Sequence, residues 1–336
     1  MPFCRLKRRE FITLLGGAAA WPLAARAQQI GQVPRIVLWL GGLGPSDLET
    51  QQAAAAFRES MRAFGWVDGR NLRIDLRWVG AGFSAQEMRA AASETISLTP
   101  DVVVTTGAPI LAALQSETKT IPLVFTFVTD PVSDGFVVSL TRPGGNITGF
   151  TIFDHSFAGK WLEMLKEVVP SMTRVAVMQN PDHPAWTAYL RTIGTIAPRI
   201  GVEVTPAPVS NVVDIAPALD AFARVPNGGL IILPSALGTN HREAIASAAL
   251  RHRLPSIYSL RMYPLAGGLM SYGVPRTEPY SQAATYVDRI LKGAKPAELP
   301  VQAGAKFEMV FNLKTATALG ITLPPTVLVR ADEVIE

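Results

Sequence analysis

Small and polar residues follow several apolar runs of this chain, in positions where they could hold a small molecule by hydrogen bonds. The first such loop carries Gly42 and Ser46 after the run 36–40. Glu49 stands three residues beyond Ser46, a spacing that predicts a capping box and a helix start whose backbone N–H groups favour a carboxylate. A capped helix without any ligand explains the same residues, so both interpretations stay open.

Two more loops of this kind occur in the first half of the chain. Thr106, Gly107 and Ala108 follow the run 102–105, and their hydroxyl and amide groups could grip a polar head group. Thr126 and Asp130 follow the run 121–125. Asp130 directly precedes a proline, so it could pair with a ligand ammonium or simply form a turn.

The second half of the chain repeats this arrangement of polar and aromatic residues after apolar runs. The residues that could contact a ligand there are Asn180, Asp182, Trp186, Ser235, Ala236, Tyr258 and Tyr272. Aromatic walls with a few aimed polar groups suit a small organic ligand. Each of the aromatic residues could instead belong to the core.

The sequence lacks the common catalytic and cofactor motifs. It contains no Walker loop, no HExxH, no GxSxG and no cysteine-rich metal spacing, and Gly42 and Gly44 lack the third glycine of a dinucleotide fingerprint. The histidines, among them His183 in one of the candidate loops, are scattered. We therefore predict no catalytic residue, no metal ligand and no cofactor.

The elements that position these loops follow from a pattern along the chain. Short β-rich runs alternate with amphipathic stretches of helical length, which is typical of parallel βαβ units. In open parallel sheets, ligands bind beyond the carboxyl ends of the strands. We expect strands at 36–40, 72–78, 102–105, 121–125, 174–178, 202–205, 229–233 and 269–272. We expect helices at 53–64, 85–98, 160–168, 185–200, 213–224, 242–253 and 280–291. The pattern predicts two similar α/β halves in succession.

The first residues have the layout of an export leader. Arg8 and Arg9 precede an apolar run, and Ala25 and Ala27 form the small-x-small pattern that signal peptidase recognises. We expect a signal peptide over residues 1–27, with cleavage between Ala27 and Gln28, and the mature protein in the periplasm. The paired arginines resemble a twin-arginine signal, although an ordinary secretory leader stays open.

Removing this leader changes the charge and the cysteine content of the chain. The segment 1–27 holds five basic residues against one acidic residue, which is the whole formal charge of +4, and it holds the single cysteine, Cys4. The mature chain is therefore formally neutral, which gives no support to a nucleic-acid-binding surface. With 48% hydrophobic residues, the chain can bury two cores of ordinary domain size without disulfides.

Several segments together resemble one family. The leader RREFI, the stretches DPV at 130–132, RPGGNITG at 142–149 and GGLMSYG at 267–273, and the tail segments ILKG at 290–293, LPV at 299–301, NLK at 312–314 and ADEV at 331–334 are similar to the ABC transporter substrate-binding family abundant in rhizobia. The resemblance covers essentially the whole mature chain. It implies a type I periplasmic-binding-protein-like fold of the α/β class, in which two doubly wound Rossmann-like lobes with parallel sheets close on a ligand held in the cleft between them.

On this resemblance, the N-terminal lobe comprises 33–150 plus about 275–298, and the C-terminal lobe 151–274 plus about 299–336. We expect crossings between the lobes near 149–153, 271–275 and 299–304, with the helix at 280–291 packed on the first lobe. The implied function is a periplasmic solute-binding component of an ABC uptake transporter. Its ligand is expected to be a small polar or amphipathic molecule, either an amino acid or an aromatic carboxylate, bound by hinge closure.

The expected partners are that small-molecule ligand and an ABC permease in the inner membrane, with no nucleic acid, and the protein is expected to be a monomer. Two alternatives stay open. One is an exported α/β enzyme in which Asp130, His183 and Ser235 converge. The other is a periplasmic sensor subunit for a membrane kinase, which the same fold could serve.

Overall fold

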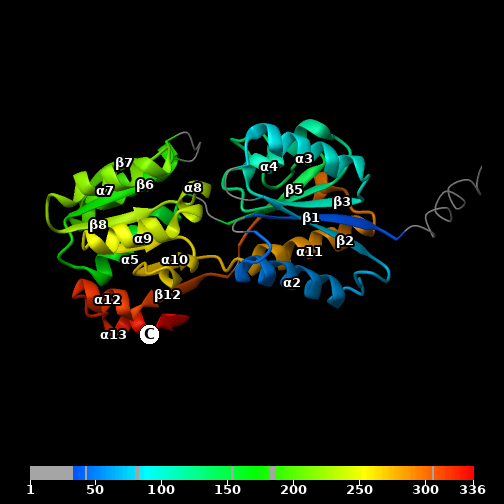
Figure 1. Cartoon of the computed structure of the whole chain (residues 1–336). Coiled ribbons are helices and arrows are strands. Elements are labelled where there is room, and N and C mark those ends of the chain that lie inside the picture. Colours follow the sequence, from blue (N-terminus) through cyan, green and yellow to red (C-terminus); the bar gives the residue numbers. More distant parts are fainter. Residues whose placement is uncertain (1–32, 42–43, 80–82, 153–154, 182–185, 305) are drawn as a thin grey trace, which may run out of the picture.

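The computed structural model describes residues 33–41, 44–79, 83–152, 155–181, 186–304 and 306–336. Within these ranges the chain forms two mostly parallel sheets, each covered by helices (Figure 1). This confirms the predicted α/β class with two doubly wound lobes. The expected signal peptide, 1–27, lies outside the described residues and stays a prediction.

The first sheet and its helices are called the N-lobe below. Its strand order is β11-β5-β4-β3-β1-β2, and all of its pairings are parallel. Its strands are β1 (Arg35–Gly41), β2 (Arg73–Val79), β3 (Val102–Thr106), β4 (Leu123–Thr126), β5 (Ile147–Thr151) and β11 (Gln302–Ala303). Its helices are α2 (Leu48–Ala63), α3 (Ala85–Ser97), α4 (Ala108–Glu117) and α11 (Thr277–Leu291).

The second sheet and its helices are called the C-lobe. Its strand order is β13-β12-β10-β9-β8-β6-β7, with an antiparallel pairing between β10 and β12. Its strands are β6 (Arg174–Gln179), β7 (Glu203–Pro208), β8 (Gly228–Ile232), β9 (Ser256–Tyr258), β10 (Met270–Gly273), β12 (Glu308–Asn312) and β13 (Glu333–Ile335). Its helices are α5 (Phe157–Val168), α6 (Trp186–Ile196), α7 (Ile215–Ala223), α8 (Ala236–Asn240), α9 (Arg242–Arg251), α10 (Met262–Leu265), α12 (Leu313–Leu319) and α13 (Pro325–Leu328).

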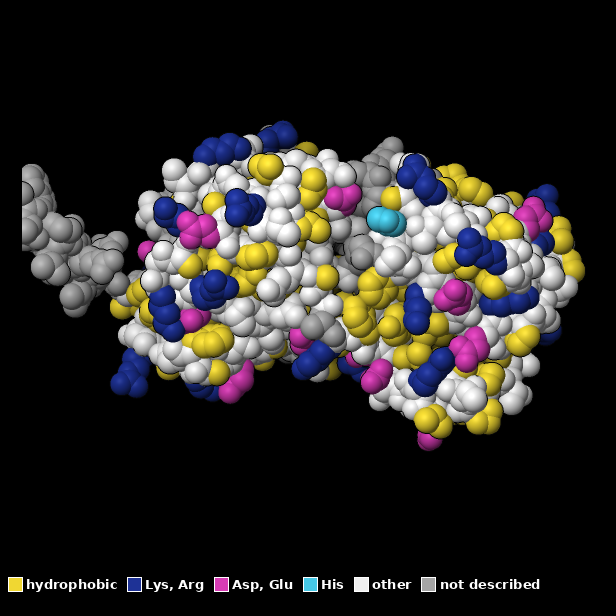
Figure 2. Space-filling model, turned by 180° about the vertical axis from the view of Figure 1, so that it is seen from behind, with side chains coloured by type: hydrophobic (Ala, Val, Ile, Leu, Met, Phe, Trp, Pro, Cys, Tyr) yellow, Lys and Arg dark blue, Asp and Glu magenta, His cyan; other side chains and the backbone are white. Residues whose placement is uncertain are grey.

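Both sheets are buried on both faces, which is why their strands read as continuous apolar runs. In β1, Ile36 and Leu38 pack under α2 and α11, whereas Val37 and Trp39 pack under α3 and α4. The C-lobe sheet is likewise covered by α5 and α6 on one face and by α7 and α9 on the other. On the face seen in Figure 2, the described basic side chains are interspersed with acidic ones over both lobes.

Three of the differences from the sequence prediction are described here. Helix α2 begins at Leu48, because the Asp47 carboxylate accepts the Thr50 N–H and caps the helix one residue after Ser46. The predicted capping box of Ser46 and Glu49 is therefore wrong. Segment 108–117, for which we predicted no helix, forms α4. Strand β11 pairs with β5, so the segment 302–303, assigned to the C-terminal lobe from the sequence, extends the N-lobe sheet instead.

Within the described residues, the chain passes between the sheets after β5, after β10 and after β11. Each passage begins inside the range expected from the sequence, at residues 152, 274 and 304. Helix α11 returns to pack against α2 and buries Tyr280, Ala283 and Val287 in the N-lobe. The N-lobe is thus completed by residues that follow the C-lobe strands in sequence. No helix in the described ranges is both long and apolar enough to cross a membrane.

Candidate functional site

The two lobes share one strand arrangement, and this places a candidate site in each. The shared strand orders are β2-β1-β3-β4-β5 in the N-lobe and β7-β6-β8-β9-β10 in the C-lobe. The direction in which successive strands are added reverses between β1 and β3 in the first, and between β6 and β8 in the second. Ligands of open α/β sheets bind beyond the carboxyl ends of strands at such switch points. Figure 1 shows α8, which follows β8, on the side of the C-lobe that faces the N-lobe. We therefore built the site from the loops at these two points.

At the switch point of the N-lobe, the Thr106 side chain packs closely against Gly41. A Cβ on Gly41 would lie 2.7 Å from Cγ2 of Thr106, so the ends of β1 and β3 leave no room for a larger residue. Gly107 has a φ of 75°, in the left-handed region that favours glycine, and begins α4 without a side-chain cap. The first N–H groups of this helix are therefore not satisfied by a capping side chain.

Phe127, directly after β4, is held in an unusual conformation between the lobes. Its φ is 57°, which is a genuine outlier for a bulky residue and marks a position that the surrounding structure enforces. Its ring centroid lies 5.9 Å from that of Tyr280. The ring packs against the N-lobe core under α2 and α11 and also against both core clusters of the C-lobe.

Next to this ring lies a buried pair of opposite charges. Arg276, just before α11, donates from Nη2 to the Gly41 carbonyl oxygen at 2.5 Å, and its Cζ lies 5.7 Å from the Phe127 ring centroid. Its Nε lies 3.8 Å from Oε2 of Glu49 in the first turn of α2. The two side chains are only 9% and 11% exposed. In the described part of the chain, neither this Nε nor either Glu49 oxygen has a hydrogen-bond partner.

Charged groups of the C-lobe face the same space. Burial raises the pKa of the Glu49 carboxyl, while Arg276 and then Arg261 of the C-lobe oppose the shift. Burial raises the pKa of Glu308, the first residue of the C-lobe strand β12, to about 7 against the pull of Arg261, and the Glu49 charge raises it further. The two lobes are therefore electrostatically coupled across their junction.

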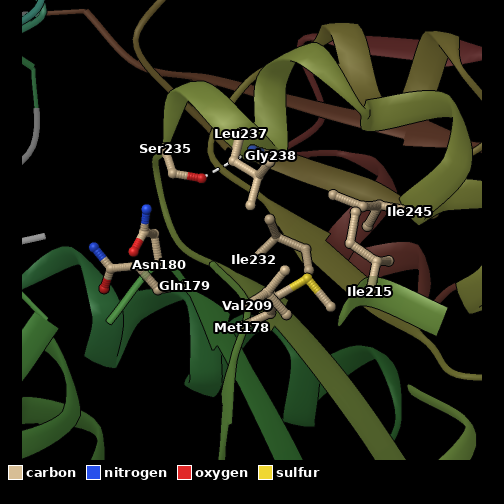
Figure 3. A pocket seen from close by; sticks show the side chains of 10 residues that line it. All are labelled: Met178, Gln179, Asn180, Val209, Ile215, Ile232, Ser235, Leu237, Gly238 and Ile245. Atoms are coloured by element: carbon tan, nitrogen blue, oxygen red, sulfur yellow. Dashed lines mark hydrogen bonds between the residues drawn. The ribbon is translucent and has the colours of Figure 1, made fainter. Parts of the chain in front are cut away.

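At the switch point of the C-lobe, a narrow pocket lies below a polar rim (Figure 3). The residues lining it are Met178, Gln179, Asn180, Val209, Ile215, Ile232, Ser235, Leu237, Gly238 and Ile245. Its cavity volume is about 10 Å³, room for about one water molecule. The amides of Gln179 and Asn180 point away from the apolar lining (Figure 3). A ligand would therefore meet the rim and not enter this pocket.

Gln179 is the outstanding residue of that rim. It is 2% exposed, and both Oε1 and Nε2 lack a hydrogen-bond partner among the residues that the structure describes. A buried amide without partners costs free energy and requires an explanation, and a ligand group at this strand end would supply one.

Several residues predicted from the sequence lie at the two switch points. Thr106, Gly107 and Ala108 are half-buried at the N-lobe edge, and Asn180 and Ser235 lie at the C-lobe edge. The Ser235 hydroxyl accepts the Gly238 N–H at 2.9 Å and caps α8. Ala236 and Trp186 are the first residues of α8 and α6, and their side chains lie outside the description.

Other predicted residues have structural roles. Thr126 is fully buried and its hydroxyl donates to the Thr105 carbonyl, and Tyr258 is fully buried and stacks on Tyr263 at 4.4 Å between centroids. In this structure both side chains belong to the packed interior of their lobes, and their contact with a ligand stays a prediction. Asp130 accepts the Ser133 N–H at 3.0 Å, which is the turn-forming alternative.

The remaining predicted residues lie outside the two switch points or outside the described structure. Tyr272 packs with Phe157 and Phe307 beside the crossings, and Ser46 is exposed before α2. Gly42 and Asp182 lie outside the described residues.

The sequence interpretation missed Arg276, Gln179 and the ligand potential of Phe127, and it interpreted Glu49 only as a cap. Arg276 follows β10 and carries no motif, so its position over the N-lobe could not be read from spacing. For Phe127 and Gln179 the sequence did contain a weak signal. Both residues stand at the ends of apolar runs, and ligands of open sheets bind at the loops that follow such runs.

The sequence matches the family described as ABC transporter substrate binding protein over residues 47–335. It is 25% identical over 274 residues to a tyrosine-binding protein of Clostridioides difficile strain R20291, a match that spans 80% of this chain and 76% of that protein.

Solved structures with similar folds cover 90% of this chain. A conserved domain protein from Vibrio cholerae is 27% identical with a TM-score of 0.80, and all of its chain is covered. An ABC domain from a Streptococcus species, solved in complex with L-Trp, is 21% identical with a TM-score of 0.80, again over its whole chain. The latter similarity is one of fold.

Proposed function

Since this chain belongs to the family of ABC transporter substrate binding proteins, we propose that it captures an amino acid or an aromatic carboxylate between its lobes and delivers it to a membrane permease. The carrying observation is that, within the described residues, buried polar atoms without a hydrogen-bond partner lie at both switch points: Nε of Arg276 and the carboxylate oxygens of Glu49 in the N-lobe, and the amide of Gln179 in the C-lobe. The tyrosine-binding relative supports a ligand of this class.

The mechanism is a shift between open and closed arrangements of the lobes. A ligand that contacts both switch points binds the closed arrangement more tightly, and it shifts the population by its difference in affinity for the two states. The passages after β5, β10 and β11 are where the backbone can rotate, because each is short and connects two rigid sheets. The permease would then recognise the closed form.

The site is proposed to make and break no covalent bond. The Ser235 hydroxyl is engaged as the cap of α8 and Asp130 holds a turn, so neither is arranged as a nucleophile with its base. The proposed location is the periplasm after cleavage between Ala27 and Gln28, and the proposed state is a monomer. A histidine kinase gene in place of permease and ATPase genes beside this one would instead favour a sensor subunit.

A thermal-shift screen tests the proposal. Purified mature protein is melted with each of the twenty amino acids and with a set of aromatic carboxylates and amines. A ligand bound only by the folded form, present at 100 times its Kd, stabilises by about 2.7 kcal/mol and raises the melting temperature. Stabilisation by at least one compound, recovered chemically unchanged after incubation, supports a solute receptor. Conversion of that compound to a product would refute it.

A further inference from the structure

The pair formed by Arg276 and Glu49 is incomplete as it stands. A separation of 3.8 Å between Nε and Oε2 gives Coulomb attraction but exceeds the length of an N–H···O hydrogen bond. Both side chains are about nine-tenths buried, and their polar atoms named above find no hydrogen-bond partner within the described structure. Buried charges are stable only when they are paired and fully hydrogen-bonded. In the described structure, Nε of Arg276 and the carboxylate oxygens of Glu49 therefore still lack hydrogen bonds.

The other charged groups that act on Glu49 have partners elsewhere, apart from Nε of Arg261, which is buried without a hydrogen-bond partner in the described structure. Asp47 accepts the N–H and the hydroxyl of Thr50 as the cap of α2. Arg261 pairs with Glu333 at 2.5 Å, and Arg242 pairs with Glu243 at 3.2 Å. These groups influence the Glu49 carboxyl electrostatically and place no hydrogen bond on it. The missing partners must therefore come from outside the described chain.

Resting on the proposed function, we infer that Arg276 and Glu49 bind the two charges of a zwitterionic α-amino acid, with Arg276 taking the carboxylate and Glu49 the ammonium. The α-carboxylate and α-ammonium are joined through one carbon atom, so they can lie antiparallel across a cation and an anion that are themselves in contact. Each buried charge then gains a charge-assisted hydrogen bond. Of the two ligand classes proposed above, this selects the amino acid over the aromatic carboxylate.

The surroundings fix the orientation of the arginine. Its Nη2 is held by the Gly41 carbonyl at the end of β1, and its guanidinium lies over the Phe127 ring, which limits its rotation. The partly exposed Phe127 ring provides apolar surface beside the charges and is backed by the fully buried ring of Tyr280. The ligand side chain would lie toward these rings and toward the C-lobe rim at Gln179.

The test uses three matched ligand series on the unmodified mature protein, measured by isothermal titration. They are L-tyrosine, tyramine and 3-(4-hydroxyphenyl)propanoate; L-tryptophan, tryptamine and indole-3-propanoate; and L-leucine, 3-methylbutan-1-amine and 4-methylpentanoate. A buried polar site rejects an analogue that leaves its groups unpaired. We expect at least one amino acid to bind, and its amine and its acid to bind at least about 100-fold more weakly.

Variants assign the roles. Glu49→Gln should abolish most of the discrimination between the amino acid and its acid, and Arg276→Met most of that between the amino acid and its amine. Glu59→Gln on α2 and Arg289→Met on α11 are matched controls, since both residues are exposed, and they should leave every affinity unchanged. Melting curves of the ligand-free variants show whether they fold. If a variant does not fold, the ligand series on the unmodified protein still tests the inference.

The outcomes separate this inference from the proposed function. Binding of an acid or an amine within about 10-fold of its amino acid would overturn the inference and leave a solute receptor standing. Folded variants that keep full discrimination would also overturn the assignment. If none of the twenty amino acids binds while an aromatic carboxylate or amine of the wider screen does, the zwitterion site is refuted and the solute receptor is retained. No stabilisation by any compound would refute both.

Discussion

Replacement of Gln179 by methionine should make the empty protein more stable and the receptor weaker. The Gln179 side chain is 2% exposed at the end of β6, and both of its amide atoms lack hydrogen-bond partners in the described structure. Methionine has nearly the same length and no polar group to desolvate. The backbone carbonyl of residue 179 still accepts the Val209 N–H, so the strand end is kept.

The magnitude follows from the cost of an unsatisfied buried group. Removing it should stabilise the empty protein by about 2 kcal/mol, which raises the melting temperature by about 4–8 °C. If the amide hydrogen-bonds a charged ligand group in the closed form, its loss costs about 1.5–3 kcal/mol, or roughly 10- to 150-fold in Kd. Stability and affinity should thus move in opposite directions.

Thermal melts of the empty protein and titration with the best amino acid from the screen measure the two effects. Gln302→Met in β11 is the control, because that glutamine is exposed and should change neither quantity. A Gln179→Met protein that melts several degrees lower and binds normally would refute the reasoning. It would mean that the amide has a structural partner and does not face the ligand.

Two further predictions concern the framework. Gly149→Ala places a Cβ 2.2 Å from the Phe125 carbonyl oxygen. It should destabilise the protein by about 3 kcal/mol and lower the melting temperature by about 6–12 °C. Gly145→Ala is the control, because it has open space around it and should be nearly neutral. Burial raises the pKa of Glu308 from 4.5 to about 7. Between these pH values the folded protein holds a proton that the unfolded chain has lost. The free energy of unfolding should therefore fall as the pH rises from 4.5 to about 7. Glu308→Gln should remove this slope and raise the melting temperature at pH 8 by about 2–4 °C; an unchanged pH profile would contradict the assignment.

Much of the framework could be predicted from the sequence because it depends on local patterns. The continuous apolar runs at 36–40 and 175–178 became the buried parts of β1 and β6. Helix α4 was missed because Gly107 and Pro109, which usually punctuate loops, here begin a helix whose first residue follows a left-handed glycine. The capping error at Ser46 has a similar origin, since two adjacent residues can both cap and only their geometry decides.

The site could be predicted only in part. The positions of Thr106, Gly107, Asn180 and Ser235 at the switch points could be predicted because every loop at the carboxyl end of a strand is a candidate, and their contact with a ligand stays a prediction. Thr126 and Tyr258 satisfied the same rule and proved to be core residues. A strand residue points to one face or to the other, and a shift of one position moves it from the ligand edge into the core.

The sequence by itself determined that this chain has two α/β halves and that their polar loops follow buried strands, because strand and helix periodicities are written into neighbouring residues. The tertiary structure decided which residues meet. Arg276 reaches Glu49 and Phe127 because the chain returns from the C-lobe and packs α11 against α2. Contacts between distant segments follow from how helices pack across a sheet, and the spacing of residues along a chain carries no record of that packing.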